Sequence, residues 1–543
     1  MKPIYNIKIF RVFAVVFLLL SVLFCYLYFF QHSSHTHIHR KIEKHGRKLK
    51  TKLYNPRETT VIIKERIVHL DLKGAPPKIS YYSKLFPLLV KMGATGVLIE
   101  YEDMFPYNGP LLKNVTAFNS YTLEEIKTIN HLAKENNLKV IPLVQTFGHL
   151  EFLLKLEEFK DYREVWNYPS AICPSYTNTL EVIKEMLHQV IEAHPESGII
   201  HIGSDEVFHL ATCQRCRDKM LTDNLTKNKL YLNHITSVIN AIRQKNPNLK
   251  ILAWDDHFRL LNHTDIQKSR LGVNFEPVVW QYQKDVYDEL GPSLWNMYSK
   301  AFSSLWAASA FKGAIGSNKY ISDVNHYVQN HKSWLAVIKE YGRKIHFEGI
   351  ILTGWQRYDH FAVLCELLPV GLPALAMSLR LLLGYKDSLI GPPTEVAKLL
   401  QCSQPYGLIG SAFGTPKCKF PGGDILEYII HLHQLKQEYE EIIEDSRVKG
   451  WLNEYNIKYL FSNPHYVKSV LLPLDKIKDE LEYVKDNISR ALREVYDKYT
   501  VSEWLETFVK PFETEVLKLW RAKHELLKKE SWPRRPLDFK HEL

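Results

Sequence analysis

The stretch Gly198-Ile-Ile-His-Ile-Gly-Ser-Asp-Glu-Val207 contains an apolar, strand-like run followed by two adjacent carboxylates. Successive side chains on a strand point to opposite faces. Asp205 and Glu206 can therefore share a cavity only where the strand ends and the backbone turns, and the Gly203-Ser204 hinge favours such a turn. Paired carboxylates there are typical of an acid/base site, because their environments can push their pKa values apart. The alternative is that both acids cap the following helix.

Seven further apolar runs resemble this one, and amphipathic helical patterns lie between several of them. The predicted strands cover residues 66–72, 96–102, 138–145, 198–203, 251–255, 273–282, 305–311 and 349–355, and the predicted helices cover 80–92, 123–136, 180–193, 229–245 and 324–341. Alternating strands and helices predict a parallel sheet. Eight such units predict an α/β fold, a (β/α)₈ TIM barrel over residues 64–384, with the sixth and seventh units the least regular.

Chemistry-bearing residues follow the predicted strands at their C-terminal ends, the edge where the active sites of such barrels lie. They are Asp71, Lys73, Glu100, Glu102, Asp103, Gln145, His149, Asp205, Glu206, Trp254, Asp255, Asp256, Trp280, Tyr282, Phe311, Lys312, Trp355, Arg357, Tyr358 and Asp359. A sugar packs its C–H face on indole rings and needs charged acceptors for its hydroxyls. The combination predicts a carbohydrate site.

Residues 12–30 form a run of 19 residues without a charge. This is about the length needed to cross a hydrocarbon core, and the small-residue cleavage signal of a secretory peptide does not follow it. We therefore expect a short tail over residues 1–11, an uncleaved transmembrane signal-anchor helix over 12–30 and a basic stem over 31–63. A cleaved signal peptide is the alternative.

Several features predict a single-pass type II membrane protein whose folded part lies in the lumen of the endoplasmic reticulum, Golgi or secretory pathway. Glycosylation triplets, readable only on the lumenal side, begin at Asn114, Asn224, Asn262 and Asn487. The final Lys540-His-Glu-Leu543 is similar to a retention tail, with a different second residue. Positive charges flank both ends of the apolar run, so charge alone leaves its orientation open.

Positive charge is concentrated in the first 52 residues. They hold ten Lys and Arg and one acid, Glu43, for a net charge of +9, whereas the whole chain carries +10. The remainder is therefore close to neutral, which argues against a nucleic-acid-binding surface on the folded part.

Six of the seven cysteines lie outside the apolar run, and Cys213 and Cys216 have the spacing of a zinc or redox motif. Because no second pair at ligand spacing accompanies them, we expect no metal site. A local disulfide, or pairing of each with another cysteine, is expected instead.

Beyond residue 384 the pattern changes to helices, expected over residues 424–445, 473–500 and 502–530. The C-terminal helical region, residues 385–543, is expected either to pack on the barrel or to form a homodimer contact. We expect no catalytic role for it, because no cluster of acids or histidines stands out there.

Four motifs make the barrel resemble glycoside hydrolase family 20, the β-N-acetylhexosaminidases. They are His201-Ile-Gly-Ser-Asp-Glu-Val207, Leu305-Trp-Ala-Ala-Ser-Ala-Phe-Lys-Gly313, Ile351-Leu-Thr-Gly-Trp-Gln-Arg-Tyr-Asp-His360 and Leu364-Cys-Glu-Leu-Leu-Pro-Val-Gly371. The resemblance covers roughly residues 64–384. It implies a retaining exo-glycosidase, without a cofactor, that removes terminal β-linked N-acetylhexosamine from glycoconjugates.

The resemblance also implies substrate-assisted catalysis, in which the substrate's 2-acetamido oxygen is the nucleophile. Glu206 would be the general acid and base, and Asp205 would orient the acetamido group. Because adjacent acids repel each other's ionisation, we expect Glu206 to be protonated and Asp205 charged. The implied substrate-binding residues are Trp254, Trp280 and Trp355 as walls, Tyr282 as a donor to the acetamido carbonyl, His149 as support for the acids, and Asp71 and Asp359 as hydroxyl acceptors. Each of these tryptophans could instead belong to the core.

One departure from the family pattern leaves the sugar preference open. Many members carry an Arg at the end of the first strand to bind O3 and O4, but here that strand reads His69-Leu-Asp-Leu-Lys-Gly74. Recognition through Asp71 or Lys73 is expected instead. The choice between N-acetylgalactosamine and N-acetylglucosamine therefore stays open.

Three other hypotheses remain. The acid pair could be Asp255-Asp256, because some glycosidases that use acetamido assistance also carry neighbouring acids. The chain could be a catalytically inactive, membrane-tethered glycan-binding barrel. A metalloenzyme is disfavoured, because His and Asp residues at ligand spacing are lacking.

Overall fold

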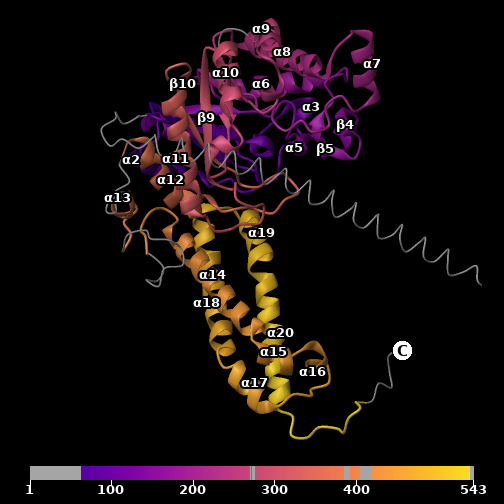
Figure 1. Ribbon diagram of the computed structural model, residues 1–543, viewed down its shortest axis with the longest axis vertical. Coiled ribbons are helices and arrows are strands. Elements are labelled where there is room, and N and C mark those ends of the chain that lie inside the picture. Colours follow the sequence, from indigo (N-terminus) through magenta and orange to yellow (C-terminus); the bar gives the residue numbers. More distant parts are fainter. Residues whose placement is uncertain (1–62, 270, 272–274, 385–391, 404–416, 538–543) are drawn as a thin grey trace, which may run out of the picture. The chain divides into compact units, whose positions relative to one another are not determined.

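The computed structural model describes residues 63–269, 271, 275–384, 392–403 and 417–537 (Figure 1). The predicted tail, signal-anchor helix and nearly all of the predicted stem lie outside these residues, as does the retention-like C-terminus. Within the described part of the chain, no helix is long and apolar enough to cross a membrane.

Eight parallel strands close into a barrel, which confirms the predicted TIM-barrel architecture. They are β1 (Glu65–Asp71), β2 (Gly96–Glu100), β3 (Lys139–Leu143), β6 (Ile199–His201), β7 (Lys250–Trp254), β8 (Phe275–Trp280), β9 (Ser304–Lys312) and β10 (His346–Gly354). The order around the barrel is β1-β10-β9-β8-β7-β6-β3-β2, and β2 pairs with β1. Each predicted strand overlaps one of these, and the irregular sixth and seventh units supply β8 and β9.

Helices connect the strands and cover the barrel. The five predicted ones are α2 (Ile79–Met92), α4 (Leu123–Glu135), α6 (Thr179–Ala193), α8 (Lys227–Lys245) and α11 (Val324–Tyr341). The loops and remaining connections contain α3 (Gly109–Leu112), α5 (Glu151–Leu154), α7 (Gln214–Thr222), α9 (His263–Ser269), α10 (Pro292–Ala301), α12 (Leu368–Leu382), the short 3₁₀ helices η1 (Glu102–Met104), η2 (Glu157–Tyr162), η3 (Phe258–Leu260) and η4 (Val286–Asp288), and the antiparallel hairpin of β4 (Arg163–Val165) and β5 (Tyr168–Ile172).

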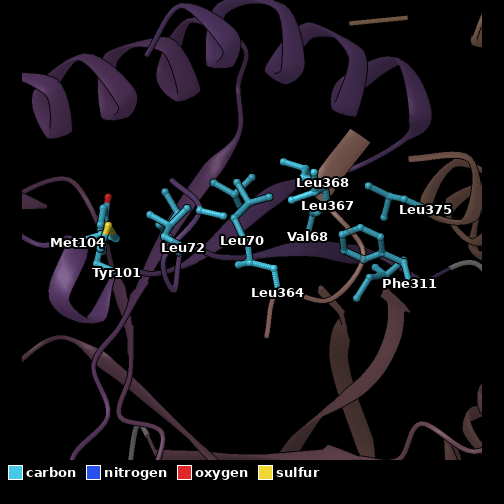
Figure 2. Close-up of a cluster of buried hydrophobic side chains, with 14 of the residues drawn as sticks. Val68, Leu70, Leu72, Tyr101, Met104, Phe311, Leu364, Leu367, Leu368 and Leu375 are labelled. Atoms are coloured by element: carbon cyan, nitrogen blue, oxygen red, sulfur yellow. The ribbon is translucent and has the colours of Figure 1, made fainter. Parts of the chain in front are cut away.

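The alternation of side chains along each strand builds two apolar layers. On β1, Ile67 belongs to the cluster inside the barrel, whereas Val68 and Leu70 pack outward in the larger cluster beneath the helices. Figure 2 shows Val68 beside Leu367, the N-cap of α12, and Leu70 near Leu364, all in this larger cluster. The inner cluster therefore leaves the inward positions at the C-terminal strand ends for polar and aromatic side chains.

The C-terminal region is helical, but its helices break differently from the prediction. Its elements are α13 (Pro392–Leu399), α14 (Gly423–Glu444), α15 (Ser446–Trp451), α16 (Glu454–Lys458), α17 (Pro464–Val470), α18 (Leu474–Val495), α19 (Lys498–Phe508) and α20 (Lys510–Leu527). The expected helix over 473–500 is wrong beyond Val495, because the Asp497 side chain caps a new helix by accepting from the Tyr499 and Thr500 N–H groups. Pro511 lies in the first turn of α20, where proline is well tolerated.

The helical region contacts the barrel close to its C-terminal rim. The Thr500 hydroxyl donates to the Gly74 carbonyl oxygen at 3.1 Å, and the Arg357 guanidinium contacts the Glu503 carboxylate at 2.9 Å. These contacts tie α19 to the loops after β1 and β10. A homodimer contact through this region stays a prediction.

The cysteines pair differently from the expected local disulfide. Cys402 and Cys418 form a disulfide near the start of the helical region. Cys213 and Cys216 are not joined to each other, and Cys173 and Cys365 are also outside disulfides.

Candidate active site

A cavity of about 230 Å³ opens at the C-terminal end of the barrel strands. Its lining combines acids, cations and aromatic rings, and consists of Lys73, Glu100, His149, Asp205, Glu206, Trp280, Tyr282, Gly313, Ala314, Trp355, Arg357 and Tyr358. Residues from seven different strand ends therefore meet in one hollow, as expected of a barrel rim.

The backbone turns sharply after β6, which lets both adjacent acids line the cavity. Gly203, Ser204 and Glu206 have φ values of +62°, +71° and +48°. These lie in the left-handed region, which residues other than Gly rarely adopt. The Glu206 N–H donates to Asp256 Oδ2 at 2.9 Å, which holds this turn in place. Neither acid caps the next helix, because α7 begins only at Gln214 and its N-cap is Cys213.

The loop after β3 approaches the same turn closely. A side chain at Gly148 would place its Cβ 2.0 Å from the Asp205 carbonyl oxygen, a distance at which the backbone would have to move. Only glycine therefore lets the two loops pack together here. This close approach brings the next residue, His149, against the acids.

His149 lies between the two carboxylates. Its Nε2 is 3.1 Å from Glu206 Oε2 and 3.5 Å from Asp205 Oδ2. Burial lowers the pKa of this histidine, but the charge of Asp205 and the hydrogen bond to Glu206 outweigh it and raise the pKa to about 10. At neutral pH the site therefore holds an imidazolium beside the acid pair.

The two acids differ in burial, and the difference corrects one expectation. Asp205 is buried, whereas the Glu206 side chain is 37% exposed. Burial raises the pKa of Asp205 to about 7, even though the His149 charge lowers it. Adjacency alone had suggested a charged Asp205, whereas burial in the free enzyme favours the neutral form of this acid.

Three of the four predicted aromatic residues line the cavity: Trp280, Tyr282 and Trp355. The Trp280 and Tyr282 rings stack at a centroid distance of 5.3 Å. Trp254 instead lies in the inner barrel cluster, completely buried, with its ring 5.9 Å from that of Trp355. Its place corresponds to the core-packing alternative: it supports a wall of the cavity from below.

Asp71 and Asp359 are not among the residues that line the cavity, and the carboxylate of each already accepts hydrogen bonds from backbone N–H groups. Asp71 accepts from the Lys73 N–H at 3.0 Å and the Gln356 N–H at 2.7 Å. Asp359 Oδ1 accepts from the Phe361 and Ala362 N–H groups in its own turn. Both carboxylates thus shape the loops that carry other lining residues.

Glu100 and Arg357 were expected on the rim without a role in the substrate site, and Lys73 was expected there as an alternative to Asp71 in sugar recognition; all three line the cavity. Glu100 is buried and bonded to His69 Nε2 at 3.0 Å, and Lys73 Nζ lies 3.6 Å from its other oxygen. Arg357 reaches the end of β1 from the loop after β10, with its guanidinium over Gly74. The signal available in the sequence was the period-2 alternation, which places Glu100 on the inward face of β2 with Leu98.

Asp255 and Asp256, the alternative acid pair, point to different sides, because successive side chains alternate at the end of a strand. Asp255 is completely buried, holds the Arg259 guanidinium at 2.6 and 2.8 Å, and accepts from the Tyr298 hydroxyl at 2.8 Å. Asp256 faces the turn of the acid loop instead. The two carboxylates do not share a cavity, so this pair lacks the geometry of an acid/base site.

A closed barrel with an acid pair in an aromatic-lined hollow at its C-terminal rim defines a glycoside hydrolase. The comparisons with known proteins then give the family. The pattern of glycosyl hydrolase family 20, catalytic domain, matches residues 79–287. A protein of Homo sapiens named Hexosaminidase D is 39% identical over 454 residues, 82% of this chain and 91% of that protein. The chain belongs to glycoside hydrolase family 20 and is a β-N-acetylhexosaminidase.

Two further similarities accompany this assignment. A Hexosaminidase D of Bos taurus is 47% identical over 319 residues, covering 59% of this chain and 92% of that protein. Among solved structures, a β-N-acetylhexosaminidase from Bacteroides fragilis is similar with a TM-score of 0.46 at 15% identity, over 62% of this chain and 70% of that one.

Proposed function

We propose that this enzyme is a retaining exo-glycosidase that removes terminal β-linked N-acetylgalactosamine, N-acetylglucosamine or both by substrate-assisted catalysis. The observation that carries the proposal is the left-handed turn at Glu206, which lets two adjacent acids face one cavity. A small hollow closed below by the barrel core suits a single terminal sugar better than an extended chain.

In this mechanism Glu206 protonates the leaving oxygen while the substrate's acetamido oxygen attacks the anomeric carbon. The C–O bond to the leaving group breaks and an oxazolinium ring forms. Glu206, now a carboxylate, then takes a proton from water, which opens the ring and regenerates the acid. The partly exposed position of Glu206 at the mouth suits a group that must reach both the leaving oxygen and incoming water.

Asp205 is suited to hold the acetamido N–H. Its Oδ1 is buried and accepts no hydrogen bond from the described part of the chain, so a substrate N–H would supply the missing donor. That donor favours the charged carboxylate, which also stabilises the positive oxazolinium ring.

Two cationic side chains near the end of β1 would bind the sugar hydroxyls in place of the Arg that many family members carry at the end of the first strand. Lys73 and Arg357 both line the cavity, and Arg357 lies over Gly74, directly after that strand. Together with Glu100 they would bind the sugar hydroxyls on the side away from the acid pair. Trp280 and Trp355 would form the walls around the acetamido group and the sugar face, and Tyr282 would donate to the acetamido carbonyl.

We also propose that the enzyme is a type II membrane protein with its barrel in the secretory lumen, anchored through residues 12–30. Three of the four glycosylation asparagines, Asn114, Asn224 and Asn262, are exposed, as the modification requires. The test is protease protection in sealed microsomes combined with sensitivity of the electrophoretic mobility to peptide N-glycosidase. Digestion of the barrel without detergent would refute the topology.

The test of the catalytic proposal is Glu206→Gln, assayed with aryl N-acetylgalactosaminide and N-acetylglucosaminide substrates across pH. We expect kcat to fall by about 10²-fold or more on both sugars, as for loss of a general acid. Asp359→Asn is the matched control, because this carboxylate is outside the cavity lining; it should keep near-normal turnover. Near-normal turnover in Glu206→Gln would refute the assignment, and saturable glycan binding without turnover by the unmodified protein would favour the inactive glycan-binding alternative.

A further inference from the structure

Four potential metal ligands from three separate elements meet beside the acid-bearing loop. Glu164 comes from β4, Cys173 follows β5, and Cys213 and Cys216 lie at the start of α7. Their ligand atoms all lie within 4.8 Å of one another. Spacing along the chain does not reveal this cluster, because only the fold brings Cys173 and Glu164 to the Cys213-X-X-Cys216 pair.

The sulfur separations match a shared tetrahedral ion and not a disulfide. Cys173 Sγ lies 3.5 Å from Cys213 Sγ and 3.6 Å from Cys216 Sγ. A disulfide requires about 2.05 Å between sulfurs. Two thiolates bound to one Zn²⁺ at about 2.3 Å in tetrahedral geometry lie about 3.8 Å apart, so the observed distances are within a few tenths of an ångström of that edge.

The surroundings of Glu164 also fit a metal ligand. This side chain is 2% exposed, and its Oε1 accepts from the backbone N–H groups of Thr212 and Cys213. Its Oε2 points into the thiol cluster, 3.1 Å from Cys216 Sγ. The backbone therefore fixes one oxygen and aims the other at the sulfurs, the arrangement by which outer hydrogen bonds orient a ligating carboxylate.

The cysteines are held in place in the same way. Cys173 and Cys216 are completely buried, and Cys213 Sγ accepts the Cys216 N–H at 3.3 Å as the N-cap of α7. Three thiols can form at most one disulfide, which leaves the third unpaired, whereas a single ion binds all three. We propose that Cys173, Cys213, Cys216 and Glu164 bind one Zn²⁺ in a closed, structural site.

The site joins two loops of the active-site rim. The β4–β5 hairpin lies in the long segment after β3 that also carries His149, and α7 follows the turn of the acid pair after β6. Figure 1 shows β4, β5 and α7 together at the side of the barrel. The zinc would clamp these loops, so its loss should lower stability and loosen the contact between His149 and Glu206 without removing any group from the cavity.

The decisive measurement is the zinc content of the purified full chain, by inductively coupled plasma mass spectrometry. We expect about one zinc per chain, and at least about tenfold less in Cys173→Ser and Cys216→Ser. Cys365→Ser is the matched control, since it removes a buried thiol outside the cluster and should keep the zinc. Glu164→Cys supplies a fourth thiolate and should also keep it. Replacement by Co²⁺ should give a thiolate-to-cobalt absorption band in the wild type that is lost in Cys173→Ser.

Two results would overturn the proposal: zinc below about one-tenth of an ion per wild-type chain, or zinc that is unchanged in Cys173→Ser. A disulfide between any two of the three cysteines in a peptide map would do the same. If the serine variants fail to fold, the wild-type protein still decides the question. Titrating its thiols with an organic mercurial should release the zinc, and the absence of released zinc would contradict the site.

Discussion

His149 should control the ionisation of Asp205, and replacing it should move the pH dependence of catalysis. In the proposed mechanism Asp205 must be charged, so kcat/KM should fall as the pH drops below the pKa of about 7 that burial imposes on this acid. The His149 imidazolium holds that pKa down from a distance of 3.5 Å. In His149→Asn the charge is lost, an amide donor is kept, and the left-handed φ of +51° is tolerated. Because the pKa of Asp205 rises when this charge is removed, we expect the acidic limb of the kcat/KM profile to move to higher pH.

The size of the shift follows from the geometry in two ways. At 3.5 Å and an effective dielectric constant of about 20, two unit charges attract by about 5 kcal/mol, or about 3.5 pKa units. The pKa of His149 itself rises from 6.5 to about 10, and this shift is similar in size to the one calculated for Asp205. Because water would fill part of the space left by the ring, the expected shift of the limb is about 1 to 3 units.

The assay is kcat/KM for an aryl N-acetylhexosaminide from pH 5 to about 10, a range set by these pKa values. His257→Asn is the matched control. This histidine also contacts the acid loop, accepting the Val207 N–H at 2.9 Å, but burial lowers its pKa to about 4, so its replacement removes no charge. Superimposable profiles for His149→Asn and wild type would refute the reasoning. An acidic limb that persists in Asp205→Asn would show that another group produces it.

Three further outcomes are expected. Gly148→Ala should abolish activity or folding, because its Cβ would meet the Asp205 carbonyl, whereas Gly198→Ala, with open space around its Cβ, should be close to wild type; equal kcat/KM in both would contradict the close approach. Tyr282→Phe should lower kcat by about 10²-fold if its hydroxyl stabilises the acetamido carbonyl, and an unchanged kcat would remove that role. Asp497→Ala should lower the free energy of unfolding by about 1 kcal/mol or more in chemical denaturation, since it caps α19, while the exposed Asp479→Ala should change it little.

Much of the fold could be predicted from local patterns. Each of the eight apolar runs supplies one barrel strand, because a strand's period and length are properties of a few consecutive residues. Helix breaks were harder to locate. The division at Asp497 depends on a single side chain that competes for backbone N–H groups, which hydrophobic spacing does not register.

The candidate site was predictable only in part, for a similar reason. Adjacency in the chain identified the acid pair, and Trp280, Tyr282 and Trp355 were found by their place at the predicted strand ends together with the family resemblance; all three line the cavity. Depth inside the barrel was not encoded locally. Trp254 lies in the inner barrel cluster below the cavity, and Asp71 accepts the Gln356 N–H from the loop after the neighbouring strand β10, although both were expected to touch the sugar.

The sequence by itself determined the periodic elements, their parallel order and the two neighbouring acids, since these depend on residues close together along the chain. The tertiary structure decided which acid is buried, that a histidine from another loop lies between the two, and that Cys173 and Glu164 join the Cys213-X-X-Cys216 pair. The burial and ionisation of a side chain depend on groups tens of residues away in the chain, and these groups come close to it only when the barrel has closed.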